Sequence, residues 1–143
     1  MRFDLKQVAV LISGREINEF ADGADSLDVS PLADVGALTI GANGHGVFTK
    51  TNNNAVRLTM NLLQNSEDNE YLCELYNRQE KRFKNFKALE LYIEDTLNGD
   101  VYTASEGYFT IRPSFTRGNQ TNSSTWVIDF VNGETKLAKG AGY

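Results

Sequence analysis

Alternation of apolar and polar residues dominates the chain and predicts β-strands. The clearest case is residues 55–63, where every second position is apolar. The apolar set is Val56, Leu58, Met60 and Leu62, and the polar set is Arg57, Thr59 and Asn61. A period of two places these sets on opposite faces of a strand, so we expect one buried and one wet face. Similar patterns predict strands at 5–12, 15–20, 25–30, 35–41, 87–95, 101–112 and 124–131.

Turn residues divide these strands in a way that is typical of hairpins. Ser13 and Gly14 separate the first two strands, and Asn98 and Gly99 separate the strands at 87–95 and 101–112. Pro31 has no backbone N–H to donate to a neighbouring strand, so it indicates a strand end.

One helix is predicted at about residues 66–80. Asn65 or Ser66 can cap its first turn, acidic residues begin it and basic residues follow it. Leu72, Leu75 and Tyr76 form a single apolar stripe, so one face is expected to be buried. The fold class predicted is mainly β: a β-sandwich or barrel with one packed α-helix.

The predicted domain organisation is a single β-sandwich domain over residues 1–131, followed by a flexible tail at 132–143. Within the domain, residues 42–54 are predicted to form a long loop rich in Gly and Asn, with Val47 and Phe48 at its centre. Long loops in compact domains are usually functional, so this loop is a candidate interaction site.

Composition narrows the class of protein. The chain has 143 residues, of which 41% are hydrophobic, and a formal net charge of -5, so a soluble globular chain is expected. An acidic chain is a poor candidate for gripping nucleic acid through its phosphates. The single cysteine fits a reducing place of folding, and we expect neither a signal peptide nor a membrane span.

The stretch FADGADSLD carries Asp22, Asp25 and Asp28 around Gly23 and raises the question of a calcium loop. The calcium pattern requires an oxygen ligand two positions after the first aspartate, where this chain has Ala24, and its glycine comes later. A solvated acidic turn is the favoured interpretation.

Other candidate chemistry is weak. His45 is the single histidine and sits in GANGHG, which lacks the Lys-Ser/Thr of a phosphate-binding loop. Cys73 is expected to be a small buried hydrophobe. Glu90 and Glu94 share a strand face and could form an acid–base pair, but a wet strand face explains them equally. No catalytic residue, metal or cofactor is predicted.

Two aromatic sets leave binding alternatives open. The run KRFKNFK at 81–87 interleaves basic residues with Phe83 and Phe86, a pattern that can bind single-stranded nucleic acid or simply cover a charged surface. Tyr92, Tyr102 and Tyr108 could serve a ligand-binding or carbohydrate-binding β-sandwich module, although they alternate as core or interface residues do.

The order of four landmarks resembles the phage tail tube protein family. These are the hairpin ending in FADGADSLDV, the GANG loop, the strand AVRLTMNLLQNS running into the helix NEYLCELYN, and a last strand with Trp126 after IRPSFTRG. The resemblance covers nearly the whole chain, and only the tail after Asn132 has no counterpart.

The resemblance implies a structural protein of the virion tail, assembled in the host bacterial cytoplasm. Family members form hexameric rings around a continuous inner β-barrel, and stacked rings conduct phage DNA into the host. Expected partners are further copies of the chain and the sheath, tape-measure, baseplate and terminator proteins of a contractile tail. Alternatives are a tube similar to that of type VI secretion and a tail-terminator ring.

Two sets of site residues follow from this resemblance. A DNA conduit should repel phosphate, so acidic and polar residues are expected to face the lumen without binding DNA. The lumen candidates are Asp25, Asp28, Arg57, Thr59 and Asn61. The long loop is expected to reach the adjacent ring, and its candidates are Asn43, His45, Val47, Phe48 and Lys50.

Overall fold

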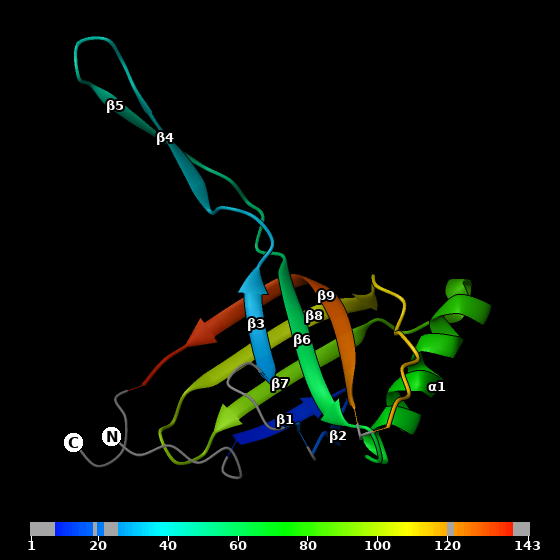
Figure 1. Ribbon diagram of the computed structural model, residues 1–143. Coiled ribbons are helices and arrows are strands. Elements are labelled where there is room, and N and C mark those ends of the chain that lie inside the picture. The colour runs from blue at the N-terminus through cyan, green and yellow to red at the C-terminus, as the bar shows by residue number, and fades with distance from the viewer. Residues whose placement is uncertain (1–7, 19, 22–25, 120–121, 139–143) are drawn as a thin grey trace.

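Antiparallel strands and one α-helix make up most of the chain (Figure 1). The computed structural model describes residues 8–18, 20–21, 26–119 and 122–138. Its elements are β1 Val8–Ile12, β2 Arg15–Glu16, β3 Leu27–Pro31, β4 Gly36–Ile40, β5 Gly46–Lys50, β6 Val56–Leu63, α1 Asp68–Lys81, the 3-10 turn η2 Phe83–Asn85, β7 Leu89–Asp95, β8 Val101–Phe109 and β9 Ser123–Lys136. The predicted mainly β class with one packed α-helix is confirmed.

Seven strands form one antiparallel sheet in the order β2-β1-β7-β8-β9-β6-β3. This sheet curves strongly, because β1 and β6 lie four strands apart and still bury side chains in the same core. An antiparallel bridge between Phe20 and Leu62 joins the segment after β2 to β6. The curvature therefore brings the two ends of the sheet toward each other around the core.

The core follows the predicted alternation. Four residues of β6 at every second position are buried, with Leu58, Met60 and Leu62 fully inaccessible. Trp126, Ile128 and Phe130 of the neighbouring β9 lie directly opposite Met60, Leu58 and Val56 and are also buried. Cross-strand pairs of this kind are the unit that stabilises a sheet.

Helix α1 closes one side of the core through buried polar contacts. The side-chain amide of Gln79 donates to the Phe109 carbonyl (2.8 Å) and accepts from the Phe109 N–H (2.8 Å). At the other end, Glu67 occupies the N-cap position, so the prediction of Asn65 or Ser66 there is wrong; the Ser66 hydroxyl nevertheless accepts from the Asp68 N–H (3.2 Å). Leu72 and Leu75 are buried as predicted.

The Ser13–Gly14 turn joins β1 to β2 as predicted, and both residues have positive φ, at 52° and 88°. This conformation suits the twist of a two-residue hairpin. The second strand is shorter than the predicted range 15–20, because only Arg15 and Glu16 pair with β1. Gly99 also has a positive φ, 85°, and lies in the turn between β7 and β8.

Two predictions of irregular structure are wrong. Residues 46–50 of the predicted loop 42–54 form strand β5, because they pair with β4 over five positions. Residues 132–136 of the predicted flexible tail continue strand β9, because they pair with residues 101–105 of β8. Residues 139–143 lie outside the described residues.

Candidate assembly surfaces

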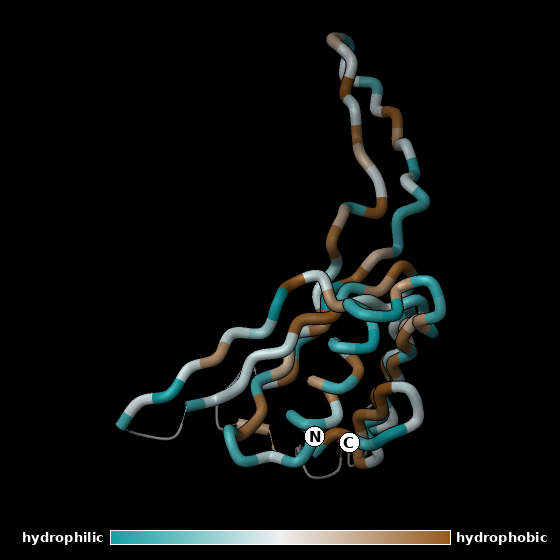
Figure 2. Tube along the Cα trace, turned by 90° about the vertical axis from the view of Figure 1, so that its right-hand side faces the viewer, coloured by the Kyte–Doolittle hydropathy of each residue, from teal (hydrophilic) through white to brown (hydrophobic). Residues whose placement is uncertain are grey.

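The β4–β5 hairpin stands away from the seven-stranded sheet and is here called the arm, residues 36–50 (Figure 2). Every side chain of β5 is exposed, and all but one position of β4 are exposed. The five loop candidates, Asn43, His45, Val47, Phe48 and Lys50, all lie in this arm. The structure therefore brings the predicted residues together on one projecting element.

The arm has two different faces. Leu38 and Phe48 are directly opposite each other, and Ile40 lies opposite Gly46. A Cβ on Gly36 would collide with the Phe48 ring, and a Cβ on Gly46 would make a tight contact with the Ile40 side chain at 3.1 Å, which shows that these apolar groups lie across the glycines. The opposite face carries Ala37, Thr39, Val47 and Thr49.

The apolar face of the arm is open to solvent. Leu38, Ile40 and Phe48 are 67%, 58% and 64% exposed. Contiguous apolar surface of this kind in a soluble protein usually marks an interface. The sequence does not predict Leu38 and Ile40 as interface residues, because the pattern of residues 35–41 predicts an ordinary strand of the domain. The sequence does contain the pattern of a β-hairpin here, since two apolar runs flank a turn rich in Gly and Asn.

Hydrogen bonds join the two flanks of the arm at its base and continue to the end of the sheet. The Thr51 N–H donates to the Val35 carbonyl (2.9 Å), and the Thr51 hydroxyl donates to the Asp34 carbonyl (2.5 Å). The Leu32 N–H then donates to the Ala55 carbonyl (2.9 Å), where the chain enters β6. The arm thus extends from the β3–β6 end of the sheet.

A polar face crosses β3, β6 and β9 and contains four of the five lumen candidates. In the register of the three strands, Asp28 is opposite Thr59, and Arg57 is opposite Asp129. The Thr125 hydroxyl donates to the Asn61 side-chain oxygen (2.7 Å). The fifth candidate, Asp25, lies outside the described residues, as does Asp22, so both interpretations of the acidic stretch stay predictions.

Arg57 and Asp129 form a bidentate ion pair on this face. The guanidinium donates from Nε to Oδ1 (2.8 Å) and from Nη2 to Oδ2 (3.1 Å), and the Thr110 hydroxyl also donates to Oδ2 (2.7 Å). Burial raises the pKa of Asp129, but the hydrogen bonds from Arg57 and Thr110 and the charge of Arg57 outweigh it and lower the pKa. The hydrogen bond and charge of Asp129 raise the pKa of Arg57.

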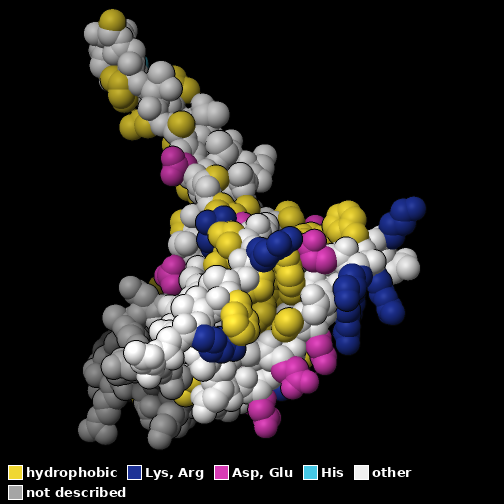
Figure 3. All heavy atoms as spheres, turned by 45° about the vertical axis from the view of Figure 1, so that its right-hand side comes forward, with side chains coloured by type: hydrophobic (Ala, Val, Ile, Leu, Met, Phe, Trp, Pro, Cys, Tyr) yellow, Lys and Arg dark blue, Asp and Glu magenta, His cyan; other side chains and the backbone are white. Residues whose placement is uncertain are grey.

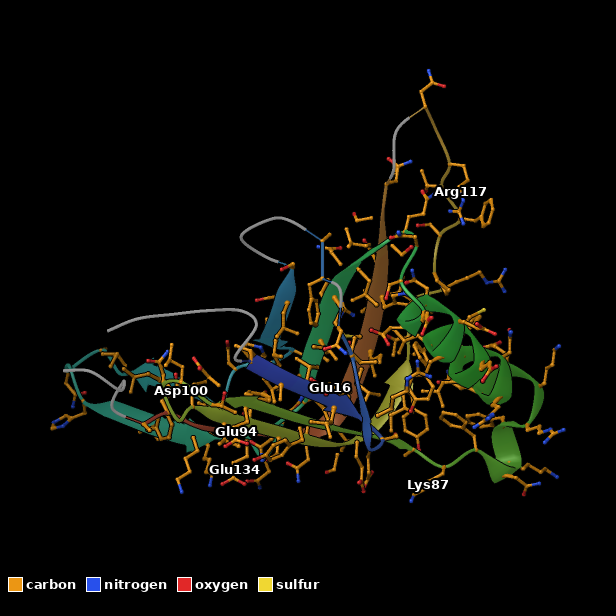
Figure 4. All side chains as sticks on the ribbon, turned by 90° about the horizontal axis from the view of Figure 1, so that it is seen from below. Glu16, Lys87, Glu94, Asp100, Arg117 and Glu134 are labelled. Carbon is orange, nitrogen blue, oxygen red and sulfur yellow. The ribbon has the colours of Figure 1, made fainter. Side chains whose placement is uncertain are left out.

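A second polar face lies on β7, β8 and the end of β9. Tyr92 is opposite Thr103, which is opposite Glu134, so the three share one face. The Tyr92 hydroxyl donates to Glu94 Oε2 (3.3 Å). Figure 4 shows Glu94 and Glu134 on the same side of the sheet. This face is here called the acidic face; it carries Glu94 and Glu134, and also Lys136, which shares a row with Val101 and Glu94. The face with Arg57 carries an internal ion pair.

Strands β1, β7, β8 and β9 form a group whose two outer edges are partly open among the described residues. The ladder between β9 and β6 ends at Phe130, and beyond it the Gly133 N–H donates to the Asn54 carbonyl (3.1 Å), so the open edge of β9 is limited to residues 134–136, which pair with β8. At the other side, β2 pairs with Leu11 and Ile12 of β1, and the Ile17 N–H donates to the Val10 carbonyl (2.7 Å), so the described open edge of β1 is its first part, before Val10. Unpaired strand edges are ready to pair with another chain.

The remaining candidates are dispersed. Cys73 is exposed, so the predicted buried position is wrong; it lies on the helix face opposite the core contacts of Leu72 and Leu75. Tyr102 packs against the core, and Tyr108 lies against Phe86 with ring centres 6.2 Å apart. Tyr92, by contrast, lies on the outer acidic face, so the structure does not gather the three tyrosines into one ligand platform.

Within the described part of the chain, no helix is long and apolar enough to cross a membrane.

The chain is similar in sequence to known phage structural proteins. The profile of the family described as Bacteriophage PhiTE tail tube protein matches residues 9–138. A curated relative, Structural protein ORF10 of Pseudomonas phage KPP10, is 27% identical over 106 residues, which are 74% of this chain. The matched region spans 61% of the length of that relative.

Solved structures of the same fold come from contractile injection systems. The sheath/tube terminator of the extracellular contractile injection system PVC has a TM-score of 0.59 at 13% identity, covering 96% of this chain and 98% of its own. The tube terminating cap of the anti-feeding prophage has a TM-score of 0.58 at 12% identity, covering 96% and 93%. A chain of the PVC sheath-tube complex gives 0.59 at 12% identity, with the same two shares.

The matched profile covers most of the chain, and the fold agrees with it. The class is therefore that of phage tail tube proteins, which are structural rather than catalytic. The chain belongs to the Bacteriophage PhiTE tail tube protein family.

Proposed function

We propose that this protein is the repeating subunit of a phage tail tube, in which hexameric rings stack along one axis and conduct DNA into the host. The observation that carries the proposal is the arm, an exposed apolar hairpin that projects from the sheet of a tail tube family member. A heterologous contact repeated along an axis produces an open filament, which is the geometry of a tube.

Ring closure is assigned to the open strand edges. Residues 134–136 of β9 and the outer edge of β1 lie at opposite sides of the group β1-β7-β8-β9. Pairing of one edge with the other edge of a neighbouring subunit would extend the sheet around a ring and remove both unpaired edges.

The lumen wall has two candidate faces in this arrangement. One is the predicted set with Asp28, Arg57, Thr59 and Asn61, to which Asp25 belongs by sequence. The other is the acidic face with Glu94 and Glu134, which lies on the strands that carry the open edges. Either face lets DNA pass without specific binding, because neither presents a concentrated row of cations.

The proposed setting is the tail of the virion, with assembly in the host bacterial cytoplasm. The proposed partners are further copies of the chain and the sheath, tape-measure, baseplate and terminator proteins. A terminator ring is the second candidate function, because two of the three similar structures are described as a terminator and a terminating cap.

Removal of the arm tests the stacking role. Gly36 and Lys50 are directly opposite, so residues 37–49 can be replaced by an Asn-Gly link that closes a tight hairpin. We expect the shortened protein to keep its circular dichroism spectrum and cooperative unfolding, because the arm contributes no residue to the core. Electron microscopy should then show no tubes. Long tubes formed by the shortened protein would contradict the proposal, and single rings formed by the full chain would favour the terminator.

A further inference from the structure

A pocket lies between the C-terminal half of α1, η2 and the start of β7, and is here called the basic pocket. It has a volume of about 580 Å³, in the range typical of ligand sites. Its lining residues are Ser13, Tyr71, Leu75, Arg78, Arg82, Asn85, Phe86, Lys87 and Leu89. None of the surfaces assigned to tube assembly above includes it.

The floor of the basic pocket is apolar and held in place. Leu75 and Leu89 are buried, and Phe86 packs against Tyr108. The Tyr71 hydroxyl donates to the Ile12 carbonyl (2.9 Å), and the guanidinium of Arg15 lies over the Tyr71 ring at 4.6 Å. A floor fixed by these contacts loses little conformational freedom when a ligand binds.

The rim of the basic pocket is positively charged, because Arg78, Arg82 and Lys87 line it, and these three belong to a longer basic run. Five of the 14 Lys and Arg residues fall in the ten positions 78–87 of a chain with net charge -5: Arg78, Lys81, Arg82, Lys84 and Lys87. All five are exposed. Figure 3 shows several Lys and Arg side chains gathered at the right-hand end of the molecule, the end that carries the α-helix in Figure 1.

These cations have no anionic partner within the described chain. The ion pairs among the described residues are Arg15–Asp68 and Arg57–Asp129, so Glu74 and Glu80 of α1 form none with the rim. Stabilisation of the helix C-terminus accounts for Arg78 and Lys81, which lie in its last turn. It does not account for Lys84 and Lys87, which follow the helix.

We propose that the basic pocket binds an acidic segment of a second protein, which places an apolar side chain on the floor and carboxylates against Arg78, Arg82 and Lys87. Arginine pairs with carboxylate through two parallel hydrogen bonds, so two of the three rim residues suit this ligand. The proposal does not depend on tube formation, because every lining residue comes from one subunit.

The two projecting segments that the structure describes, the arm and residues 110–119, do not match that description. The arm carries no Asp or Glu between Gly36 and Lys50. The exposed segment 110–119 also carries none and contributes Arg112 and Arg117 instead. Because neither described projection offers a carboxylate, the complementary segment is assigned to a different protein rather than to a second copy.

A nucleic acid fits the pocket less well. Binding of single strands uses several exposed aromatic rings along a basic groove. Here Phe83 is 71% exposed, but the second phenylalanine of the run, Phe86, is half-buried against Tyr108. The cations surround one compact apolar floor instead of following a groove.

Fluorescence anisotropy with a labelled peptide tests the proposal. The probe is a synthetic peptide with Asp and Glu flanking a central Leu-Phe pair. Two matched probes replace the acids by Asn and Gln, or the Leu-Phe pair by Ser-Ser, and a labelled oligothymidylate is the nucleic-acid probe. We expect the acidic peptide to bind, and each matched peptide to bind about tenfold more weakly, because each removes one of the two expected sets of contacts.

Variants of the protein locate the binding. The combined substitution Arg78→Gln, Arg82→Gln and Lys87→Gln should weaken binding of the acidic peptide about tenfold. The control combines Arg112→Gln and Arg117→Gln, which remove exposed cations elsewhere; Figure 4 shows Arg117 far from Lys87. Equal binding by the pocket variant and wild type would overturn the proposal. So would equal affinity for the Ser-Ser peptide, or tighter binding of oligothymidylate that the pocket variant loses.

Discussion

At the scale of single residues, Gln79 joins the helix to the sheet. Its buried side chain pairs with both backbone groups of Phe109 in the way that a neighbouring strand would. The substitution Gln79→Ala leaves the N–H and the carbonyl of Phe109 buried without partners. We expect it to lower the free energy of unfolding by about 2–4 kcal/mol.

Urea unfolding of purified protein measures this change. The exposed neighbour provides the control, since Glu80→Ala should change the free energy of unfolding by less than about 0.5 kcal/mol. Equal stability of the two variants would show that the Gln79 hydrogen bonds do not stabilise the position of the helix.

The ion pair of Arg57 and Asp129 makes a pH-dependent contribution. The pKa of Asp129 is lower in the folded protein than in the unfolded chain, so the pair stabilises the fold above the unfolded pKa of about 3.9. This contribution is lost as the pH falls through the folded pKa. We therefore expect Asp129→Asn to lower the midpoint of thermal unfolding at pH 7, with a difference that shrinks as the pH falls below the unfolded pKa of about 3.9.

Thermal unfolding of wild type and Asp129→Asn between pH 7 and pH 3 measures how the difference between their midpoints changes with pH. The exposed Glu134→Gln is a suitable control, because Glu134 forms no ion pair with a described residue. A difference between wild type and Asp129→Asn that stays constant from pH 7 to pH 3 would exclude titration of Asp129 as its cause.

At the scale of elements, the two faces of the arm allow a matched comparison. Leu38→Ser with Phe48→Ser removes two of the three apolar side chains of the apolar face, whereas Thr39→Ser with Thr49→Ser changes the opposite face by two methyl groups. We expect the first pair to raise the protein concentration needed for tube assembly by about tenfold or more, since buried aromatic and aliphatic groups dominate interface energies.

Light scattering against protein concentration measures the assembly threshold of both variants. The second pair should assemble as wild type does. An unchanged threshold for the first pair would assign the inter-ring contact to another surface.

Elements with one buried face were the easiest to predict from the sequence. Strand β6 alternates between core and solvent, so its residues, its faces and its buried set all follow from the pattern. Strand β5 has no buried side chain, so burial imposes no alternation on its sequence, and its glycines suggested a loop. The end of β9 was missed for a related reason: its pairing with β8 is a long-range backbone contact that leaves little trace in the side chains.

Site residues that are close in sequence were also easier to predict than those that meet only through long-range pairing. The five arm candidates were found because they sit near a turn rich in Gly and Asn, although their strand partners were not recognised. The acidic face of Glu94 and Glu134 was not predicted as one surface, because its residues lie 40 positions apart and meet only through the register of β7, β8 and β9. The basic pocket likewise needs α1 and β7 to be placed beside each other.

At the scale of the whole molecule, the charges are divided among surfaces. The net charge is -5, yet the basic pocket carries three cations, and the described arm carries no acid. The acidic face lies on the strands with open edges. This separation is consistent with different tasks: repelling phosphate at one face, binding an acidic segment at another, and apolar contact through the arm.

The central claim is that copies of this chain assemble through their arms and strand edges into stacked rings. Negative-stain electron microscopy of the purified wild-type protein, over a range of protein and salt concentrations, tests it most directly. The account predicts ring-shaped particles and hollow tubes of constant diameter that lengthen as the concentration rises. Compact monomers without rings or tubes at the highest concentration would contradict it.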